Sequence, residues 1–112
     1  MYEYEGTLLK IIDGDTIDVI IDLGLDVGIR ERLRLYGINA PEMHDKPAGQ
    51  DAKDYITSIL PPVGQIRALL IDTIKDQRGK YGRYLAKIYV PPNTTSVNDQ
   101  MIDTGHAVPF MV

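Results

Sequence analysis

Carboxylates and guanidinium groups in this 112-residue chain gather in three short segments. The first, residues 13–16, reads Asp-Gly-Asp-Thr, and the second, residues 34–42, runs from an arginine to Ala-Pro-Glu. The third, residues 80–83, reads Lys-Tyr-Gly-Arg. Carboxylate oxygens suit a hard divalent cation, and the planar guanidinium group makes paired hydrogen bonds to phosphate. These residue types therefore have the chemistry to hold a metal ion beside a phosphodiester.

Each segment also has an ordinary structural interpretation. The segment at 13–16 could merely build a hairpin turn, because Asp-Gly is common in such turns. Arg34 could pair across a sheet with Glu31 or Asp18, and Arg83 could be a solvated surface base. The presence of all three segments in one short chain favours a shared site.

Strands must position the first two segments. Residues 4–12 predict a strand that ends at the Asp-Gly turn, and residues 16–23 alternate cleanly between two faces. We expect one face of the second strand to enter the core, with Ile17, Val19, Ile21 and Leu23. After a loop at 24–28, residues 29–36 predict a third strand, in which Leu33 and Leu35 alternate with three arginines, Arg30, Arg32 and Arg34. Pro41 prevents this strand from continuing as a central member of a sheet.

The rest of the chain alternates helix and strand. Apolar residues recur at helical spacing from Ala48 to Leu60, where Pro61 and Pro62 end the helix. Residues 64–74 and 84–90 predict two more strands, and residues 96–103 a short helix with Ser96 as N-cap and Gly105 as C-terminal cap. Five strands with a helix after the third predict an α+β, mainly β, barrel of the oligonucleotide-binding type. We expect a single domain over residues 1–112.

Composition limits the class of protein. Hydrophobic residues make up 44% and charged residues 25%, as in ordinary globular proteins. No apolar run is long enough to span a membrane, and no cysteine is present for a disulfide or a zinc-thiolate site. The acidic N-terminal residues do not resemble a signal peptide, which favours a cytoplasmic location and leaves secretion by another route open. We expect a monomer.

Charge is unevenly distributed along the chain. The net charge of −4 argues against a protein that coats nucleic acid indiscriminately. Residues 1–54 hold twelve acids and six bases, whereas residues 55–112 hold four acids and six bases. An acidic half beside a short basic stretch at 75–87 fits a metal site next to a phosphate-binding site.

Taken in order, the three segments resemble those of the staphylococcal nuclease (thermonuclease) family. Val-Asn at 97–98 and Gly-His-Ala at 105–107 also resemble that family's last helix and its exit, so the resemblance covers essentially the whole chain. It implies a five-stranded barrel and a nuclease dependent on Ca²⁺. The implied substrates are DNA and RNA, preferably single-stranded, with water attacking phosphorus to leave a 3′-phosphate and a 5′-hydroxyl.

The resemblance also implies a metal site. Asp15 is expected to ligate calcium through a carboxylate oxygen and Ala40 through its backbone carbonyl, while Asp13 holds metal-bound water or braces Asp15. Asn39 departs from the family, because the best-known member has a second calcium-binding aspartate there. An amide oxygen still ligates calcium, but the lost charge weakens the site and makes another divalent ion possible.

Catalytic roles follow from the same resemblance. Glu42 would orient or deprotonate the attacking water, and Arg34 and Arg83 would bind the scissile phosphate and stabilise its growing charge. Lys80 and Tyr81 would contact a flanking phosphate and the nucleotide. These five residues form the expected catalytic and substrate-binding set.

Two further features of the sequence bear on the expected site, and one alternative hypothesis stays open. His44 lies near Glu42 in sequence, but a lone histidine in a loop is usually a surface residue. Phe110 and Met111 stand where the best-known family member has tyrosines in its substrate pocket. Asn39 and the acidic net charge allow a second hypothesis: a catalytically weak or inactive barrel that binds nucleic acid or protein.

Overall fold

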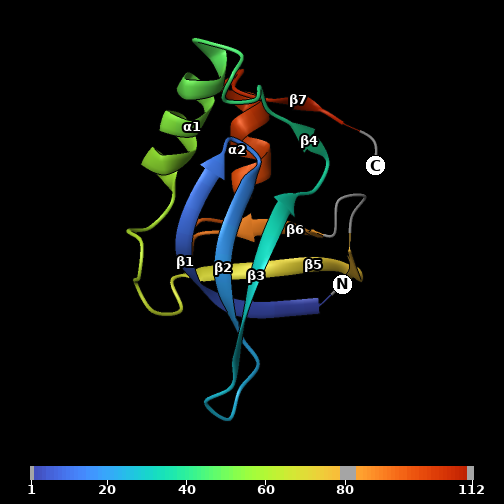
Figure 1. Ribbon diagram of the computed structural model, residues 1–112. Coiled ribbons are helices and arrows are strands. Elements are labelled where there is room, and N and C mark those ends of the chain that lie inside the picture. Colours follow the sequence, from blue (N-terminus) through green and yellow to red (C-terminus); the bar gives the residue numbers. More distant parts are fainter. Residues whose placement is uncertain (1, 79–82, 111–112) are drawn as a thin grey trace.

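A closed five-stranded barrel forms the body of the protein in a computed structural model that describes residues 2–78 and 83–110 (Figure 1). Its strands follow one another around the barrel in the order β1, β2, β3, β6, β5. Their bounds are Tyr2–Asp13 for β1, Thr16–Asp22 for β2, Gly28–Leu35 for β3, Leu69–Arg78 for β5 and Tyr84–Tyr89 for β6.

Pairing in the barrel is antiparallel except at one seam. β1 pairs with β2 and β5. β2 pairs with β3, from Thr16 opposite Arg34 to Asp22 opposite Gly28. At this seam β3 and β6 are parallel. The seam is short, because the two strands pair only from Leu33 opposite Tyr84 to Leu35 opposite Ala86. A five-stranded barrel with helices against it is the architecture expected from the sequence, and the predicted oligonucleotide-binding type of fold is confirmed.

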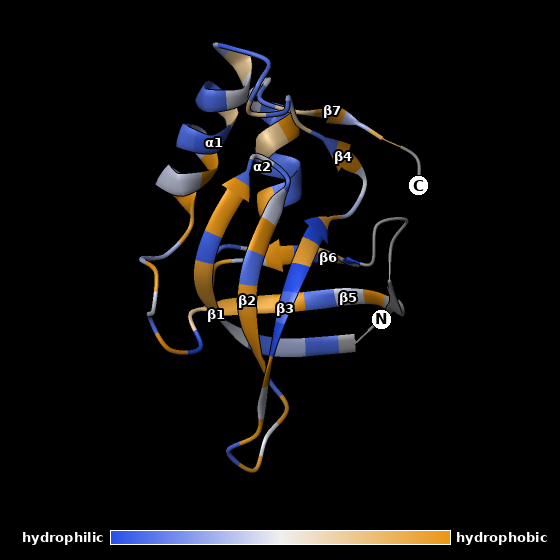
Figure 2. Cartoon of the chain, in the orientation of Figure 1, coloured by the Kyte–Doolittle hydropathy of each residue, from blue (hydrophilic) through white to orange (hydrophobic). Residues whose placement is uncertain are grey.

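The barrel interior is apolar. Alternate residues of β2 and β3 point inward, and Ile17, Val19, Leu33 and Leu35 are fully buried. Figure 2 shows long hydrophobic stretches on β1 and β2, whereas much of β3 is hydrophilic. The intervening residues of β3 face outward, so this strand separates the core from a charged outer face.

Two helices cover one end of the barrel (Figure 1). Helix α1, Ala48–Ile59, buries Gly49, Ala52 and Ile56 and ends before Pro61. Helix α2, Val97–Asp103, begins at Ser96, whose side chain accepts a hydrogen bond from the Asp99 backbone N–H. Gly105 follows α2 with a φ of 80°, so both predicted caps of this helix are confirmed.

A second, two-stranded sheet was not expected from the sequence. β4, Ile38–Asn39, pairs with β7, Val108–Pro109. The Phe110 backbone N–H then donates to the Gly37 carbonyl over 2.9 Å. This pairing holds the end of the described chain beside the segment that follows β3.

Two expectations about strands were wrong. Leu23 was expected in the core but is 47% exposed, because the β2–β3 hairpin extends beyond the barrel (Figure 1). The fourth strand of the barrel runs from Leu69 to Arg78 and not over residues 64–74. Within residues 2–78 and 83–110, neither helix is long and apolar enough to cross a membrane.

Candidate functional site

The turn between β1 and β2 brings two carboxylates to the helix-covered end of the barrel. Asp13 ends β1, and its carboxylate accepts a hydrogen bond from the Asp15 backbone N–H over 3.1 Å. Gly14 is buried between other elements, because a Cβ at this position would meet the Cβ atoms of Ala40 and Ala52, each at 2.8 Å. The glycine therefore allows close packing of the turn against α1 and the segment after β4.

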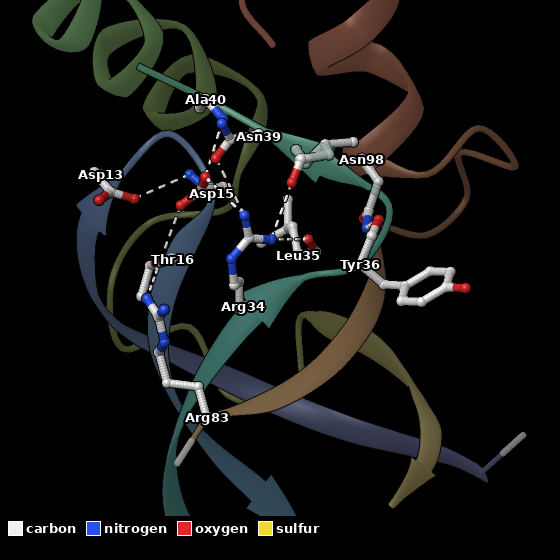
Figure 3. Close-up of polar contacts among 11 residues, drawn as sticks. Asp13, Asp15, Thr16, Arg34, Leu35, Tyr36, Asn39, Ala40, Arg83 and Asn98 are labelled. Carbon is white, nitrogen blue, oxygen red and sulfur yellow. Dashed lines mark hydrogen bonds and ion pairs between the residues drawn. The ribbon is translucent and has the colours of Figure 1, made fainter. Parts of the chain in front are cut away.

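Asp15 is the centre of the site (Figure 3). One carboxylate oxygen accepts from the Thr16 hydroxyl at 3.0 Å, and the other accepts from the Ala40 backbone N–H at 2.9 Å. Arg34 Nη2 lies 3.7 Å from this second oxygen. Because the Asp15 side chain is only 9% exposed, these contacts fix its position in a largely desolvated setting.

Asp13 differs from an ordinary surface carboxylate. Its partial burial, together with hydrogen bonding and charge from Asp15, raises the pKa of Asp13 from 3.8 to about 6. Two neighbouring carboxylates disfavour each other's ionisation, and a bound cation would relieve that repulsion.

Arg34 leaves the end of β3 and is held by backbone carbonyls. Its Nη1 donates to the carbonyl oxygens of Leu35 and Ile38 at 3.1 and 2.9 Å, and its Nη2 donates to Asn39 Oδ1 at 3.2 Å. The guanidinium carbon also lies 5.3 Å from the centre of the Phe110 ring, within reach of a cation–π contact. The alternative pairing of Arg34 with Asp18 was wrong: Asp18 pairs with Arg32.

Arg83 reaches the same centre from the start of β6. Its Nη1 donates to Thr16 Oγ1 at 3.3 Å, and the Thr16 hydroxyl donates in turn to Asp15. Figure 3 shows Arg34 and Arg83 approaching Asp15 from two different strands. The three motif segments therefore do meet, and Thr16 connects the first segment with the third.

Glu42 stands apart from this network. Its side chain is 72% exposed, and one carboxylate oxygen lies 3.3 Å from His44 Nδ1. The loop is held from behind by α1, because a Cβ on Gly49 would overlap the Glu42 carbonyl oxygen. The backbone of Glu42 is thus fixed, while its carboxylate faces solvent.

Oxygen donors define which cation the site fits. Among the described residues, no three side chains from His, Asp and Glu cluster as a metal site. Asp13 contributes a carboxylate beside Asp15, and the Asn39 side-chain oxygen lies beside Arg34, whereas Ala40 meets Asp15 through its backbone N–H. Partial burial is the main cause of the raised pKa of Asp13, and the neighbouring Asp15 adds to it. Such a set fits a hard cation that completes its coordination with water, such as calcium, and does not fit a soft metal.

Three predicted residues lie outside the described part of the chain: Lys80, Tyr81 and Met111. Conversely, the sequence interpretation gave no role to Thr16, and it noted Asn98 as part of the family resemblance without giving it a role. The buried Asn98 side chain accepts from Ile88 N–H and donates to the Tyr36 and Ala86 carbonyls at 2.8 and 3.1 Å. Asn98 thus ties α2 to β6 and to the residue after β3. The sequence signals for Asn98 are its place in the Val-Asn pair at 97–98 and its polar character within the apolar stripe of α2.

These features define a class: an oligonucleotide-binding-type barrel with an acidic turn and two arginines gathered at one end. The family model of staphylococcal nuclease homologues matches residues 32–112, and the chain belongs to this family.

Curated relatives agree with this assignment. Endonuclease YhcR of Bacillus subtilis is 28% identical over 98% of this chain, which spans 9% of that protein. Protein ParB of Escherichia coli is 32% identical over 94% of the chain and 56% of its own length. An uncharacterized endonuclease of Escherichia coli O157:H7 is 30% identical over 94% of the chain and 60% of its own length. The chain thus spans at most about 60% of these relatives, and the family supports a nuclease-like role on nucleic acid.

Proposed function

We propose that this chain is a calcium-dependent nuclease that hydrolyses phosphodiester bonds of DNA and RNA, with a preference for single strands. The observation that carries the proposal is the convergence of Asp15, Arg34 and Arg83, from three segments, on one end of the barrel. Arginines held beside a carboxylate pair suit a reaction in which a cation and a phosphate must lie close together.

Each residue then has a defined task. Asp15, braced by Thr16 and the Ala40 N–H, would hold the cation together with Asn39 and the Ala40 carbonyl. Asp13 would support this set from the end of β1. When bound, calcium would supply positive charge beside the phosphate.

The arginines act on the phosphoryl group. Arg34 and Arg83 would donate hydrogen bonds to its non-bridging oxygens, whose charge grows as phosphorus becomes five-coordinate. Loss of one such donor typically lowers the rate by roughly 10²–10³-fold. We expect Arg34→Ala to show a loss of this size.

Glu42 would take a proton from the attacking water. The water oxygen forms a bond to phosphorus, the bond from phosphorus to the 5′-oxygen breaks, and the leaving oxygen gains a proton from solvent water, to which Glu42 later releases the proton it took. The products would be a 3′-phosphate and a 5′-hydroxyl. Because the Glu42 carboxylate is exposed and beside His44, it must swing toward the bound phosphate or act through water.

Digestion of heat-denatured DNA tests the proposal. Wild type should cleave it with calcium and not with a chelator, and mass spectrometry of the products should find 3′-phosphates. Glu42→Ala and Arg34→Ala should be severely impaired, whereas Lys53→Gln, a charge change on α1, should match wild type. Equal rates in wild type and both site variants would refute the enzyme assignment.

A binding-only barrel is the second candidate, and two observations favour it. Asn39 removes one expected carboxylate, and Glu42 pairs with His44 instead of lying in the Asp15 network. Such a protein would bind a labelled single-stranded oligonucleotide and leave it intact with every divalent cation tried.

A further inference from the structure

β3 carries more arginines than the proposed chemistry uses. Arg30, Arg32 and Arg34 lie opposite Ile20, Asp18 and Thr16 of β2, all on the outer face of the barrel. Successive outward residues of a strand are about 6.6 Å apart. The three side chains therefore form a row that leads from the site along the hairpin, which we call the arginine row. Arg83 enters the same face from β6.

Pairing within the sheet does not account for this row. Arg32 binds Asp18 through Nε at 2.7 Å and Nη2 at 3.1 Å, which lowers the pKa of Asp18. The Arg32 side chain is still 51% exposed, and its Nη1 donors are not used in this pair. Asp18 thus orients Arg32 and leaves part of its guanidinium group for another anion.

Arg30 is the outermost member of the row. It is exposed, and no hydrogen bond or ion pair joins it to another described side chain. Its neighbour across the hairpin is Ile20, which carries no compensating charge. On the next strand, Lys10 lies opposite Asp18 and adds another base. In a chain of net charge −4, positive charge is therefore concentrated on the face next to the site.

We infer that the arginine row binds the phosphodiester backbone of a single strand on one side of the scissile phosphate, an inference that rests on the proposed function. Arg34 contacts the scissile phosphate, and Arg32 and Arg30 contact the next two phosphates. The distance of about 6.6 Å between successive arginines of the row is comparable to the distance between successive phosphates in an extended single strand. Neutralising several phosphates in a row is also how an acidic protein obtains affinity for nucleic acid.

Arg30→Gln is the cleanest test, because it removes one charge without leaving a described partner unsatisfied. Lys53→Gln, the same charge change on α1, is its matched control. Binding of labelled oligodeoxythymidines of increasing length is followed by fluorescence anisotropy in chelator, so that cleavage does not interfere. The same proteins are assayed for cleavage of denatured DNA with calcium.

We expect Arg30→Gln to weaken binding of the longer oligomers by about 3–10-fold and to lower the slope of log affinity against log salt by about 0.7. Arg30→Glu should weaken it further. Asp18→Asn should strengthen binding, because it releases Arg32 from its partner.

If wild type cleaves DNA but Arg30→Gln and Lys53→Gln bind every oligomer alike, the row is not a phosphate site and the nuclease proposal stands. If wild type binds oligomers through Arg30 but never cleaves, the row is confirmed and the enzyme proposal fails. If wild type neither binds nor cleaves, both are refuted.

Discussion

Asp13 is held in the folded protein so that its protonated form is favoured. Burial and the neighbouring Asp15 raise the pKa of Asp13 to about 6. A raised carboxyl pKa means that the unfolded chain loses this proton first as the pH rises. The stability linked to Asp13 is therefore fully present below its ordinary pKa of 3.8 and is lost as the pH rises through about 6.

This linkage predicts how metal-free protein responds to pH. In chelator, wild type should lose stability between about pH 4 and about pH 7 relative to Asp13→Asn, whose amide oxygen still accepts the Asp15 N–H. Urea denaturation of both proteins across this range measures the difference. Parallel stability curves would show that Asp13 titrates as an ordinary surface carboxylate.

Gly49 lets helix α1 begin directly against the loop that carries Glu42. Its backbone N–H donates to the Asp45 carbonyl, and the Asp45 N–H donates to the Glu42 carbonyl over 2.9 Å. A Cβ at Gly49 would overlap the Glu42 carbonyl. The helix therefore positions the loop by close backbone contact, with no side chain between them.

Gly49→Ala should therefore disturb both stability and activity, although alanine favours helix. Displacing packed backbone should lower the free energy of unfolding by about 1–3 kcal/mol. Thermal denaturation and the rate of DNA cleavage measure the two effects. Gln50→Ala, at the exposed neighbouring position, is the control. Equal stability and activity in the two variants would mean that the loop adapts freely.

The sequence was most informative where a pattern extends over several residues. Alternation located β2 and β3, and capping residues located α2. The two-residue strands β4 and β7 are too short to show a period. Alternation also continued to Leu23, although the hairpin there has left the barrel. The β-rich composition of residues 64–74 suggested an early start for the fourth strand, but Ile66 is 77% exposed in a loop.

The candidate site could be predicted as a set of residues but not as a network. The motifs identify Asp15, Arg34 and Arg83. The link through Thr16 joins residues 67 positions apart, and Asn98 binds a carbonyl 62 positions away. Such contacts depend on the packing of the closed barrel, which no local pattern contains. Asn39 was expected as a metal ligand, and its additional contact with Arg34 also needed the structure.

Calcium bound at the proposed site should stabilise the whole molecule, because the proposed donors belong to the β1–β2 turn and to the segment around β4. A ligand that binds only the folded state adds about 2.7 kcal/mol at a concentration 100-fold above its Kd. For a domain of this size, that corresponds to a rise in Tm on the order of 10 °C. A calcium titration followed by thermal denaturation measures the rise.

Variants at two donor positions separate a specific site from general binding of cations. Asp15→Asn should lose the calcium-dependent rise, because it removes the central carboxylate. Asn39→Asp should show the same rise in Tm at a lower calcium concentration, since it adds a charged donor. The new carboxylate would also attract Arg34 Nη2, which already donates to Asn39. If Asn39→Asp needs as much calcium as wild type while Asp15→Asn abolishes the response, position 39 serves Arg34 and not the metal.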